Sequence, residues 1–482
     1  MGTAIEAVRG MRDIPPDDQR TLYRVRTQLE ALLVQYGYAA LDLPIVEHRD
    51  LYLRKLGEEL VGKVYEFAFG GRNLALRPEW TASVLRTYVA HLQDQPLPLR
   101  LSYSGPVFRY ERPQRLTYRQ FTQVGVEMVG GLTPRADAEI IALAAAGLDT
   151  VGVTSYRVVL GHIGLVREVL TQLGLAERTQ GLLAWGLEQI RTQGPEAVRE
   201  RLREGQGDLP FDPVLFQGLD DEQATTLLLN LLRAMRVDLA FGTRPPEDIA
   251  RRLLRKLRRD ESQPRIDQAL DLLGRLSQIN GPADETLPQV TSLLVEAGLT
   301  TTTLDEIRSV LALLEAHDLE RDRIILDFGL GRGLHYYTGL IFEMYAIDNI
   351  QLCGGGRYDD LVLVLGGRQP VPAVGFAYGL ERVVAAIEPP ADSSAPRREV
   401  LVAPVADHDY AYALEAARRL RARNFAVTLD VRGRSVASNL RDAARRGIAY
   451  VAIVGAEERE RREIVWRNLD TREERRVSID EL

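Results

Sequence analysis

The feature of this 482-residue sequence that most constrains its fold is a long helical stretch inside strand-rich sequence. From about Gly164 to His317, leucine-rich patterns with helical spacing dominate, broken by loops expected at 205–213 and 280–288. On both sides of this stretch, short segments rich in β-branched and aromatic residues end at glycine or proline, as strands do. We therefore expect one mostly antiparallel sheet that begins before a helical insertion and is completed after it.

The segments around the insertion predict one helix and several strands. Residues 17–37 carry apolar residues at helical spacing and stop at Gly37, which is typical of an amphipathic helix with a glycine end. Before the insertion, strands are expected at 38–47, 63–69, 73–79, 99–112 and 118–131. After the insertion, we expect strands at 323–330, 335–346 and 349–356 and a helix over 375–388.

The C-terminal part of the chain has a different texture. A segment rich in Pro, Ser and Ala at 388–397 is typical of a linker between independently folded units. Beyond it, expected strands at 399–405, 425–431 and 450–455 alternate with expected helices at 408–422 and 435–446, which predicts a small α/β domain with a parallel sheet. The predicted organisation is a split domain over 1–165 and 320–387, a helical insertion over 166–319, a linker over 388–397 and an α/β domain over 398–482.

The charge balance excludes one class of nucleic-acid-binding protein. The chain carries 61 basic and 68 acidic residues, a net charge of −7. Proteins that coat nucleic acid through bulk positive charge have the opposite balance, so an RNA partner here requires local basic patches. One candidate is the run of six basic residues in 251–260. Such runs are more often solvated helix faces, and contact with RNA phosphates is the alternative.

Cysteine, histidine and hydropathy limit the compartment and the metal chemistry. Cys353 is the one cysteine, so no internal disulfide can form, and the six histidines lack the HxH or HxxxH spacing that favours structural zinc. The start of the sequence lacks the layout of a signal peptide, and its apolar runs are far shorter than the ~20 residues of a membrane span. We expect a cytoplasmic protein with no membrane partner.

The densest group of polar residues lies in 105–130. Its members are Arg109, Glu111, Arg112, Arg119, Gln123 and Glu127. Because strand side chains alternate, Gln123, Gly125 and Glu127 share one face, where an amide and a carboxylate point together over a small residue that leaves room for a ligand. Arg109, on the preceding strand, offers two donors to a phosphate or carboxylate. The alternative interpretation is a solvated hairpin with cross-strand salt bridges.

Two glycine-rich segments are weaker candidates. In 327–343, the glycines around Arg332 let the backbone approach a ligand closely, but the segment lacks the Gly-Lys-Ser/Thr end of a Walker loop. Tyr336 and Tyr337 follow on an expected strand, so at most one should face a pocket, and half-buried strand tyrosines are the alternative. In 353–383, glycines before a strand and Arg382 on the next helix could hold a nucleotide; a glycine-rich turn with a surface arginine is the alternative.

Taken in order, these segments resemble the class II aminoacyl-tRNA synthetases and, among them, the histidyl-tRNA synthetase family. The resemblance rests on RGMRDIPP, GYAALDLPIVEHRDLYLRKLGEE, LRPEWTASVLR, FRYERPQRLTYRQFTQVGVE, GRGLHYYTGLIFE, GGGRYDDL and PAVGFAYGLERV. It covers most of 8–165 and 324–386. The tail segment GRSVASNLRDAARRGIAYVAIVG resembles the family's anticodon-binding domain. The implied fold is an α+β catalytic domain on an antiparallel sheet, with a helical insertion, followed by a small α/β anticodon-binding domain.

The resemblance also implies an activity and a binding site. It implies an enzyme that activates L-histidine with ATP and Mg²⁺ and charges tRNA(His), as a homodimer paired through the first motif region. The residues that would bind histidine are Glu79, Thr81, Arg109, Gln123, Glu127, Arg332, Tyr336 and Tyr337. Among these, Glu79, Thr81 and Gln123 would hold the α-amino group, while Glu127 and Tyr337 would address the imidazole.

The resemblance assigns the charge-stabilising roles to arginines. Arg109 and Arg332 would be the catalytic residues, in contact with the ATP α-phosphate and the substrate carboxylate. Arg109, Glu111 and Arg382 would bind ATP. Joining a carboxylate to a phosphate brings two anionic groups together, so fixed guanidinium groups can stabilise the charge that develops there. The reaction needs no nucleophilic side chain, and the resemblance implies no metal site built from protein ligands alone.

Three departures from the family pattern stand out. His335 replaces an acidic residue beside the proposed pocket, Trp80 replaces a small residue between Glu79 and Thr81, and the helical insertion is longer than the usual bacterial form. The main alternative function is the synthetase-like regulatory subunit of ATP phosphoribosyltransferase, which shares the catalytic-type domain but does not charge tRNA. Such subunits typically lack the anticodon-binding tail and often lose the arginine found here as Arg332. An RNA-binding scaffold is a third alternative.

Overall fold

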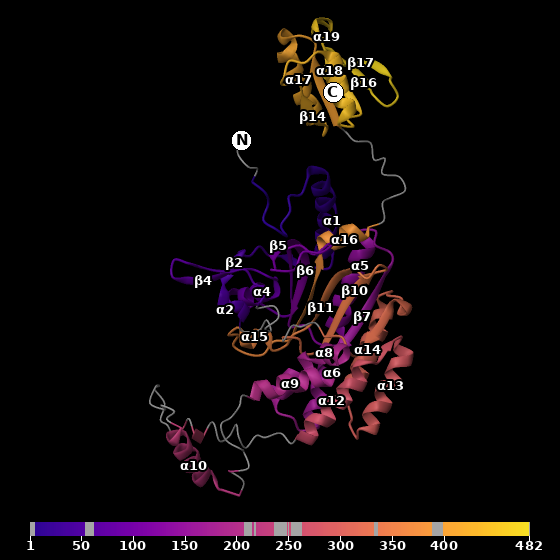
Figure 1. Cartoon of the computed structure of the whole chain (residues 1–482). Coiled ribbons are helices and arrows are strands. Elements are labelled where there is room, and N and C mark those ends of the chain that lie inside the picture. Colours follow the sequence, from indigo (N-terminus) through magenta and orange to yellow (C-terminus); the bar gives the residue numbers. More distant parts are fainter. Residues whose placement is uncertain are drawn as a thin grey trace. The chain divides into compact units, whose positions relative to one another are not determined.

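The chain forms two compact units, Met1–Glu388 and Pro389–Leu482, which are described separately. The computed structural model describes residues 5–53, 62–206, 215, 218–235, 248, 250–251, 263–331, 336–387 and 399–481 (Figure 1). The predicted linker and all but the first residue of the basic run 251–260 lie outside these residues. The predicted division of the first unit into a catalytic domain and an insertion stays a prediction.

A nine-stranded sheet organises the first unit. Its strand order is β1-β5-β6-β12-β11-β10-β7-β9-β8, and only the pairs β1/β5 and β7/β9 are parallel among the described strands. The strands are β1 (Ala39–Ala40), β5 (Leu99–Phe108), β6 (Gln120–Val129), β12 (Ala373–Gly379), β11 (Gln351–Arg357), β10 (Leu340–Ala346), β7 (Tyr156–His162), β9 (Ile324–Asp327) and β8 (Asn280–Gly281). Because β6 pairs with β12 and β7 pairs with β10, the sheet is completed after the insertion, as predicted.

Three helices cover one face of this sheet. They are α1 (Pro16–Gln35), α5 (Arg135–Thr150) and α16 (Leu380–Ala386), and they contact one another and the central strands (Figure 1). The amphipathic pattern of α1 buries its apolar side, on which Val25 and Leu29 are almost completely enclosed. Gly37 follows the helix with φ +80°, a conformation that glycine adopts without a steric penalty.

Residues on β12 show how the sheet separates core from site. Val374, Phe376 and Tyr378 point into the core beneath α1 and α5. The helix predicted to start at residue 375 is therefore wrong over 375–379, because these residues form the end of β12 and the helix begins only at Leu380. The large residues alternate with Gly375, Ala377 and Gly379, and period two is the signature of a strand.

Three of the expected strands form a second, smaller sheet. Its order is β2-β4-β3, with β2 (Val46–His48), β4 (Arg72–Leu76) and β3 (Glu66–Phe69) all antiparallel. The sequence had placed these segments in one sheet with the rest, and that expectation is wrong. Helices α2 (Arg49–Leu53) and α4 (Thr81–Thr87) accompany this sheet, and α4 continues into the π-helical turn η1 (Tyr88–Leu92).

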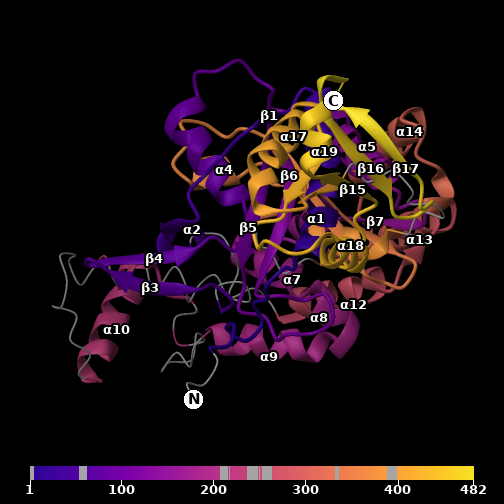
Figure 2. The same cartoon turned by 90° about the horizontal axis from the view of Figure 1, so that it is seen from above.

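The predicted insertion is helical throughout most of its described length. Its helices are α6 (Ile163–Gln172), α7 (Glu177–Trp185), α8 (Leu187–Gln193), α9 (Pro195–Gln206), α10 (Asp221–Ala234), α12 (Gln263–Ser277), α13 (Ala283–Glu296) and α14 (Thr303–Ala316). Helices α7, α8, α9 and α12 lie together (Figure 2). The loop expected at 280–288 is wrong after Pro282, because α13 begins at Ala283 and accommodates Pro288.

The second unit is built on a five-stranded sheet. Its order is β14-β13-β15-β16-β17, with β14 (Ala426–Leu429), β13 (Glu399–Pro404), β15 (Tyr450–Val454), β16 (Glu463–Asn468) and β17 (Glu474–Ser478). Helices α17 (Tyr410–Ala422), α18 (Val436–Arg445) and α19 (Ala456–Arg461) complete it. The three predicted strands are parallel, as expected. Strands β16 and β17, which the sequence did not predict, add an antiparallel hairpin at one edge of the sheet.

No helix in the described part of the chain combines the length and the apolar composition that a membrane crossing needs.

Candidate active site

Small residues make the uncovered face of the large sheet into a shallow floor. Across β6 and β12, Gln123 lies opposite Gly379, Gly125 opposite Ala377 and Glu127 opposite Gly375. Across β12 and β11, Ala377 pairs with Gly354 and Gly375 pairs with Gly356. Because residues paired across neighbouring strands point to the same face, these positions form a patch almost without side chains, on which a ligand can approach the strands.

Two adjoining pockets open on this floor. The first, which we call the tyrosine pocket, has a volume of about 900 Å³ and includes Glu79, Thr81, Tyr103, Tyr336 and Tyr337 in its lining. The second, the arginine pocket, has a volume of about 650 Å³. Its lining includes Arg109, Glu111, Tyr118, Phe121, Glu381 and Arg382. Both pockets share Arg109, Glu111, Gln123, Gln351, Gly354 and Ala377, so they are neighbouring parts of one site.

Glu127 lies beneath the tyrosine pocket rather than in its wall. Its Oε1 accepts hydrogen bonds from Thr81 Oγ1 (2.6 Å) and Tyr103 Oη (3.0 Å), and its Oε2 accepts one from Tyr358 Oη. Its carboxylate occupies the space that a side chain on Gly375 would need. Burial raises the pKa of Glu127 well above its usual range, and the hydroxyl donors act in the opposite direction. Glu127 therefore holds the hydroxyl groups of three neighbours in place.

Two buried oxygen atoms at the pocket lack a hydrogen-bond partner within the described protein. Glu79 Oε1 accepts from the Ala82 backbone N–H (3.0 Å), but Glu79 Oε2 has no partner, and neither does Gln123 Oε1. Burial raises the pKa of Glu79, and hydrogen bonds and Arg109 oppose that shift. An unpartnered buried acceptor is costly, so the pair favours a ligand with several N–H donors.

A stack of three side chains supports this pocket from below. The Arg77 guanidinium lies 3.5 Å from the centre of the Trp80 ring, and the Trp80 and Tyr103 rings stack with centroids 5.0 Å apart. Trp80 is 1% exposed. Gly105 makes room for the stack, because a Cβ there would lie 2.9 Å from both Arg77 and Trp80. Trp80, a departure from the family pattern, is thus a packing residue that fixes Tyr103.

Two expectations about individual positions were wrong. The space over Gly125 is not open to a ligand, since a Cβ there would lie 2.7 Å from Tyr103 Oη: the ring of Tyr103 fills it. Tyr336 and Tyr337 do not face opposite ways, because both line the tyrosine pocket and their ring centroids lie 4.8 Å apart. They precede β10, so the alternation of strand side chains does not apply to them. Gly356 leaves space for the Tyr337 ring.

The arginine pocket is walled by a hairpin loop and by the start of α16. Arg382 Nε donates to the Leu116 carbonyl (3.2 Å) and its Nη1 to the Gln351 carbonyl (3.4 Å). Glu381 accepts the Thr122 backbone N–H with both carboxylate oxygens (3.0 Å each). Arg109 Nε donates to the Pro78 carbonyl (2.8 Å). These bonds orient the cationic side chains toward a common cavity.

The N-terminal segment supports the same hairpin loop. Arg119 donates to the Arg9 carbonyl (3.0 Å) through Nη1, and its backbone N–H donates to the Gly10 carbonyl (2.8 Å). Gly10 has φ +85°, and a Cβ there would lie 2.6 Å from Arg119 Cδ. The Arg12 guanidinium stacks 4.1 Å from the centre of the Tyr118 ring, which lines the arginine pocket.

The structure gathers most of the predicted site residues. Of the predicted set, six line the tyrosine pocket: Glu79, Thr81, Arg109, Gln123, Tyr336 and Tyr337. The three predicted ATP-binding residues, Arg109, Glu111 and Arg382, all line the arginine pocket. Glu127 lies below the floor, whereas Arg332 and His335 lie outside the described residues.

Sequence reasoning missed several residues of the site, four of which shape the tyrosine pocket. Tyr103 and Tyr358 hold Glu127, and Glu343 and Gln351 line the tyrosine pocket, where Gln351 Nε2 donates to Glu343 Oε1 (2.6 Å). Tyr103 had a usable signal, because a bulky strand residue paired with Gly125 must fill the space that the glycine leaves. Within the part of the chain that the structure describes, no group of three or more His, Cys, Asp or Glu side chains could hold a metal ion.

Two family models and a relative of similar length match this chain. The histidyl-tRNA synthetase family matches residues 10–201 and 247–383, and an anticodon-binding domain family matches residues 399–482. A histidine–tRNA ligase of Methanocaldococcus jannaschii is 30% identical over 478 residues, covering 98% of this chain and 97% of that protein.

Solved structures show the same fold. Histidyl-tRNA synthetase from Nostoc sp. PCC 7120 has a TM-score of 0.68 at 19% identity, covering 100% of this chain and 98% of its own. A Bacillus halodurans protein described as an ATP phosphoribosyltransferase regulatory subunit/histidyl-tRNA synthetase has a TM-score of 0.67 at 23% identity, covering 95% of this chain and 100% of its own. On the family match and the full-length relative, the chain belongs to the histidyl-tRNA synthetase family.

Proposed function

We propose that this protein is a histidine–tRNA ligase, which activates L-histidine with ATP and transfers it to tRNA(His). The observation that carries the proposal is the position of Arg109, which lines both the tyrosine pocket and the arginine pocket. A residue at this junction is placed to contact an amino-acid carboxylate on one side and a phosphate on the other. The full-length relative named histidine–tRNA ligase supports the same activity.

The tyrosine pocket suits the amino group of histidine. Glu79 Oε2 and Gln123 Oε1, the two unpartnered acceptors, can receive N–H bonds from an α-ammonium group, with Thr81 beside them. A cation next to Glu79 also favours its ionised form and so offsets the effect of burial on its pKa. Binding of the ammonium group therefore removes the free-energy cost of leaving these two buried acceptors without a hydrogen bond.

The imidazole would lie toward Tyr336 and Tyr337. Both tyrosines line the same pocket and contact Tyr358, whose hydroxyl is bound to Glu127. We infer that Glu127 acts on the imidazole through the groups it positions, because it is fully buried and its two oxygens already accept three hydroxyl bonds. A site with fixed polar partners rejects isosteres that lack the ring nitrogens, since its own groups would stay unpaired.

The arginine pocket would hold ATP, with Mg²⁺ arriving on the phosphates as part of the substrate. In the first step, a carboxylate oxygen of histidine attacks the α-phosphorus, and the bond from that phosphorus to the bridging oxygen breaks to release pyrophosphate. Arg109, together with Arg332 on the strength of the family resemblance, would stabilise the negative charge on the α-phosphate. Arg382, which lines only the arginine pocket, and Glu111, which lines both pockets, would contact the nucleotide.

In the second step, a ribose hydroxyl at the 3′ end of tRNA(His) attacks the carbonyl carbon of the adenylate, and AMP leaves. The second unit would recognise the anticodon of the same tRNA, as its family match supports. The basic residues along 432–446 are the candidates for contacts with the tRNA phosphates. Three of them, Arg434, Arg445 and Arg446, pair with Asp442. Two further candidates are Arg432 and Arg441, and contacts of all five with RNA would weaken as salt rises.

The proposed assembly is a homodimer in the cytoplasm. The family resemblance places dimer contacts in the first motif region, which includes β2. In the small sheet that contains β2, Val46 is 43% exposed and Phe69 is 76% exposed. Exposed apolar side chains of this size favour an interface with a second copy. Sedimentation at micromolar concentration tests this, and a monomer there would contradict it.

One assay tests the activity. We expect histidine-dependent exchange of pyrophosphate into ATP, followed by charging of tRNA(His) in the presence of Mg²⁺. A folded protein that binds histidine but shows neither reaction would instead be a regulatory subunit of ATP phosphoribosyltransferase, which is the first of the two functions in the description of the Bacillus halodurans structure. The match of residues 399–482 to an anticodon-binding domain family favours the ligase, since such regulatory subunits typically lack this domain.

A further inference from the structure

The two pocket tyrosines stand on a short segment that is held from two sides. On the sheet side, the Thr338 backbone N–H donates to the Arg357 carbonyl (2.8 Å), and the Asp359 N–H donates to Thr338 Oγ1 (2.9 Å). On the other side, the Ile163 N–H, at the start of α6, donates to the Gly339 carbonyl (3.0 Å). The segment 336–339 is thus clamped between the sheet and the first helix of the predicted insertion.

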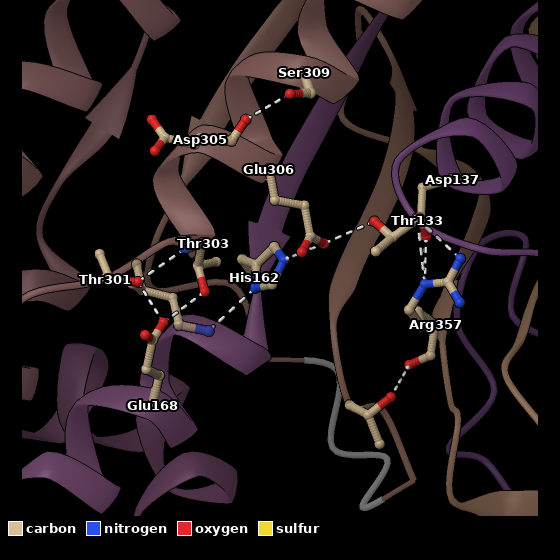
Figure 3. Close-up of polar contacts among 12 residues, drawn as sticks. Thr133, Asp137, His162, Glu168, Thr301, Thr303, Asp305, Glu306, Ser309 and Arg357 are labelled. Atoms are coloured by element: carbon tan, nitrogen blue, oxygen red, sulfur yellow. Dashed lines mark hydrogen bonds and ion pairs between the residues drawn. The ribbon is translucent and has the colours of Figure 1, made fainter. Parts of the chain in front are cut away.

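The sheet side of this clamp is anchored by a buried ion pair. Arg357 Nε lies 2.9 Å from Asp137 Oδ1 on α5 (Figure 3). Arg357 Nη1 also donates to the Gly131 carbonyl (3.0 Å). Arg357 and Asp137 are both buried. Gly339 leaves a path for the Arg357 side chain, because a Cβ there would lie 3.0 Å from Arg357 Cδ. Removing one partner of such a pair is costly, so this side is rigid.

The helix side is anchored by His162, the last residue of β7. Its Nδ1 accepts the Leu165 N–H (3.1 Å) and so caps α6; a neutral imidazole then carries its proton on Nε2. That nitrogen lies 3.3 Å from Glu306 Oε1 on α14, and the same oxygen accepts from Thr133 (2.9 Å) (Figure 3). The hydrogen bond from His162 lowers the pKa of Glu306, which keeps the acceptor ionised.

A second contact ties the same two helices together. Glu168 on α6 accepts hydrogen bonds from Thr303 Oγ1 (2.7 Å) and from Thr301 Oγ1 at the start of α14 (Figure 3). The N-terminal ends of α6 and α14 are therefore joined at two points, His162–Glu306 and Glu168–Thr303. A displacement of α14 would be passed to the start of α6.

Gly164 makes the contact between α6 and the tyrosine segment a close one. A Cβ at this position would lie 3.0 Å from the Thr338 carbonyl oxygen and 2.8 Å from His162 Cε1. There is no space for one methyl group between the helix and the segment. The first turn of α6 therefore sets how near residues 336–339 can lie to it.

We propose that the junction of α6 and α14 is a positioning device for the tyrosine pocket, with Gly164, His162 and Glu306 as positioning residues. The helical insertion thereby determines the affinity for histidine without touching it. This inference rests on the proposed function for its ligand, but the clamp itself can be measured without any substrate. It predicts that disturbing the junction weakens histidine binding and leaves ATP binding unchanged, since the contacts of the arginine pocket lie elsewhere.

The sharpest test is Gly164→Ala, with Gly181→Ala as the matched control. Gly181 lies in α7, another helix of the insertion, and a Cβ there would meet nothing within 4 Å. Both changes replace a glycine within a helix by alanine and so add one methyl group. We expect Gly164→Ala to raise the histidine KM in pyrophosphate exchange and the calorimetric Kd by about 10-fold or more, on the scale of small misplacements in a site. The ATP KM of Gly164→Ala should stay within about 2-fold of the parent value. Gly181→Ala should match the parent in the histidine KM, the histidine Kd and the ATP KM.

Two substitutions of Glu306 should weaken histidine binding to different degrees. Glu306→Ala removes the acceptor for His162 and Thr133, whereas Glu306→Gln keeps one oxygen that can accept from both. We expect the alanine variant to weaken histidine binding more than the glutamine variant, again with an unchanged ATP KM. Equal loss for both substrates, or loss of folded protein with an unchanged histidine Kd in the folded fraction, would show a merely structural role and overturn the proposal.

Hydrogen exchange separates this inference from the proposed function. In the ligand-free protein, the amide of Thr338 should exchange faster in Gly164→Ala than in Gly181→Ala, because its bond to the Arg357 carbonyl is disturbed. If the parent neither binds histidine nor exchanges pyrophosphate, the function fails while faster exchange still supports the clamp. Unchanged exchange at residues 336–340 in Gly164→Ala overturns the clamp, whatever the activity of the parent.

Discussion

Glu127 in the first unit and Asp442 in the second are each bound by three side chains, but their pKa values shift in opposite directions. Asp442 is bound by the guanidinium groups of Arg434, Arg445 and Arg446, and the hydrogen bond from Arg434 leads in lowering its pKa. Glu127 is bound by three neutral hydroxyl groups, and burial raises its pKa.

This difference distinguishes a carboxylate whose charge is already neutralised by the protein, Asp442, from a carboxylate in a site that can still receive a cationic ligand, Glu127. In the second unit, cations of the protein itself satisfy the carboxylate. In the first unit, no cation reaches Glu127 in the contacts described, and nearby Glu79 Oε2 and Gln123 Oε1 keep open acceptors. A site that will receive a cationic ligand must leave such groups unpaired, and folding stability is lower for it.

Removing the second unit gives the largest expected effect. A chain ending at residue 397 should retain pyrophosphate exchange and lose nearly all charging of tRNA(His), because both pockets lie within the first unit. The measurement is exchange and charging on the same preparation. Parallel loss of both reactions would mean that the second unit supports the fold of the first, and the comparison would lose its basis.

Arg109→Ala should give the next largest effect. Because Arg109 lines both pockets, its loss should lower the kcat of pyrophosphate exchange by about 100-fold or more, the scale of one preorganised donor. Arg109→Lys should recover only part of the activity, since a point charge cannot reproduce a two-pronged contact. Arg432→Ala in the second unit is the control, with exchange expected at the parent rate. A near-normal kcat in a folded Arg109→Ala variant would remove the residue from the catalytic set.

The pH dependence of stability should have opposite signs in the two regions. The folded-state pKa of Asp442 is lowered, so its stabilising contribution is present above the unfolded-state value of about 3.9 and is lost as the pH falls through the lower folded-state value. The folded-state pKa of Glu127 is raised, so its contribution is present below about 4.3 and is lost as the pH rises through the folded-state value.

Hydrogen exchange of peptides from each unit, measured against pH, checks these signs. Asp442→Asn should reduce the loss of stability in the second unit at acid pH and leave the first unit unaffected. Part of the loss should remain, because the pKa values of Glu415, Asp430, Glu457 and Asp480 are also lowered. Glu127→Gln should flatten the decline of the first unit toward higher pH. If the stability of both units changed with pH in the same direction, hydroxyl donors and guanidinium donors would have the same effect on the pKa of the carboxyl group they bind.

Gly10→Ala should give the smallest effect. A side chain at φ +85° is strained, and its Cβ would press on Arg119, which orients the hairpin loop of the arginine pocket. We expect the ATP KM to rise a few-fold with the histidine KM unchanged, the reverse of the pattern for Gly164→Ala. Gly37→Ala, also at positive φ but with open space around its Cβ, is the control. A change in the histidine KM alone would contradict the assignment of this loop to ATP.

The sequence predicted the large elements because their patterns repeat. Strands β5 and β6, helix α1 and the alternating elements of the second unit follow periods that a single sequence displays. The prediction of secondary structure failed where only a few residues carry the strand pattern, as in β12. The glycines of β12 are also typical of a loop or of the start of a helix, and only their cross-strand partners identify the segment as a strand. The small sheet of β2, β3 and β4 was missed because pairing between strands leaves no local signal.

Within the site, residue types were easier to predict than geometry. Arg109 and Gln123 stand out by residue type and strand alternation, Glu79 only through the family resemblance, and all three line the tyrosine pocket. The position of Glu127 below the floor depends on Tyr103 and Tyr358, which come from segments distant in sequence. The orientation of Tyr336 and Tyr337 depends on where β10 begins, and boundaries of elements are the least predictable feature of a fold.

The stacked position of Trp80 should make its intrinsic fluorescence sensitive to ligand binding in the tyrosine pocket. The chain has three tryptophans, and only Trp80 is stacked between a guanidinium and a tyrosine ring whose hydroxyl reaches the floor of the tyrosine pocket, judged on the contacts that the structure describes. Indole emission responds to local charge and to ring contacts, so a cation that arrives beside Glu79 should alter the emission of Trp80. Trp466, in the core of the second unit, lies in a separate compact body. Histidine binding should therefore be visible in the untagged, unmodified protein as a change in fluorescence.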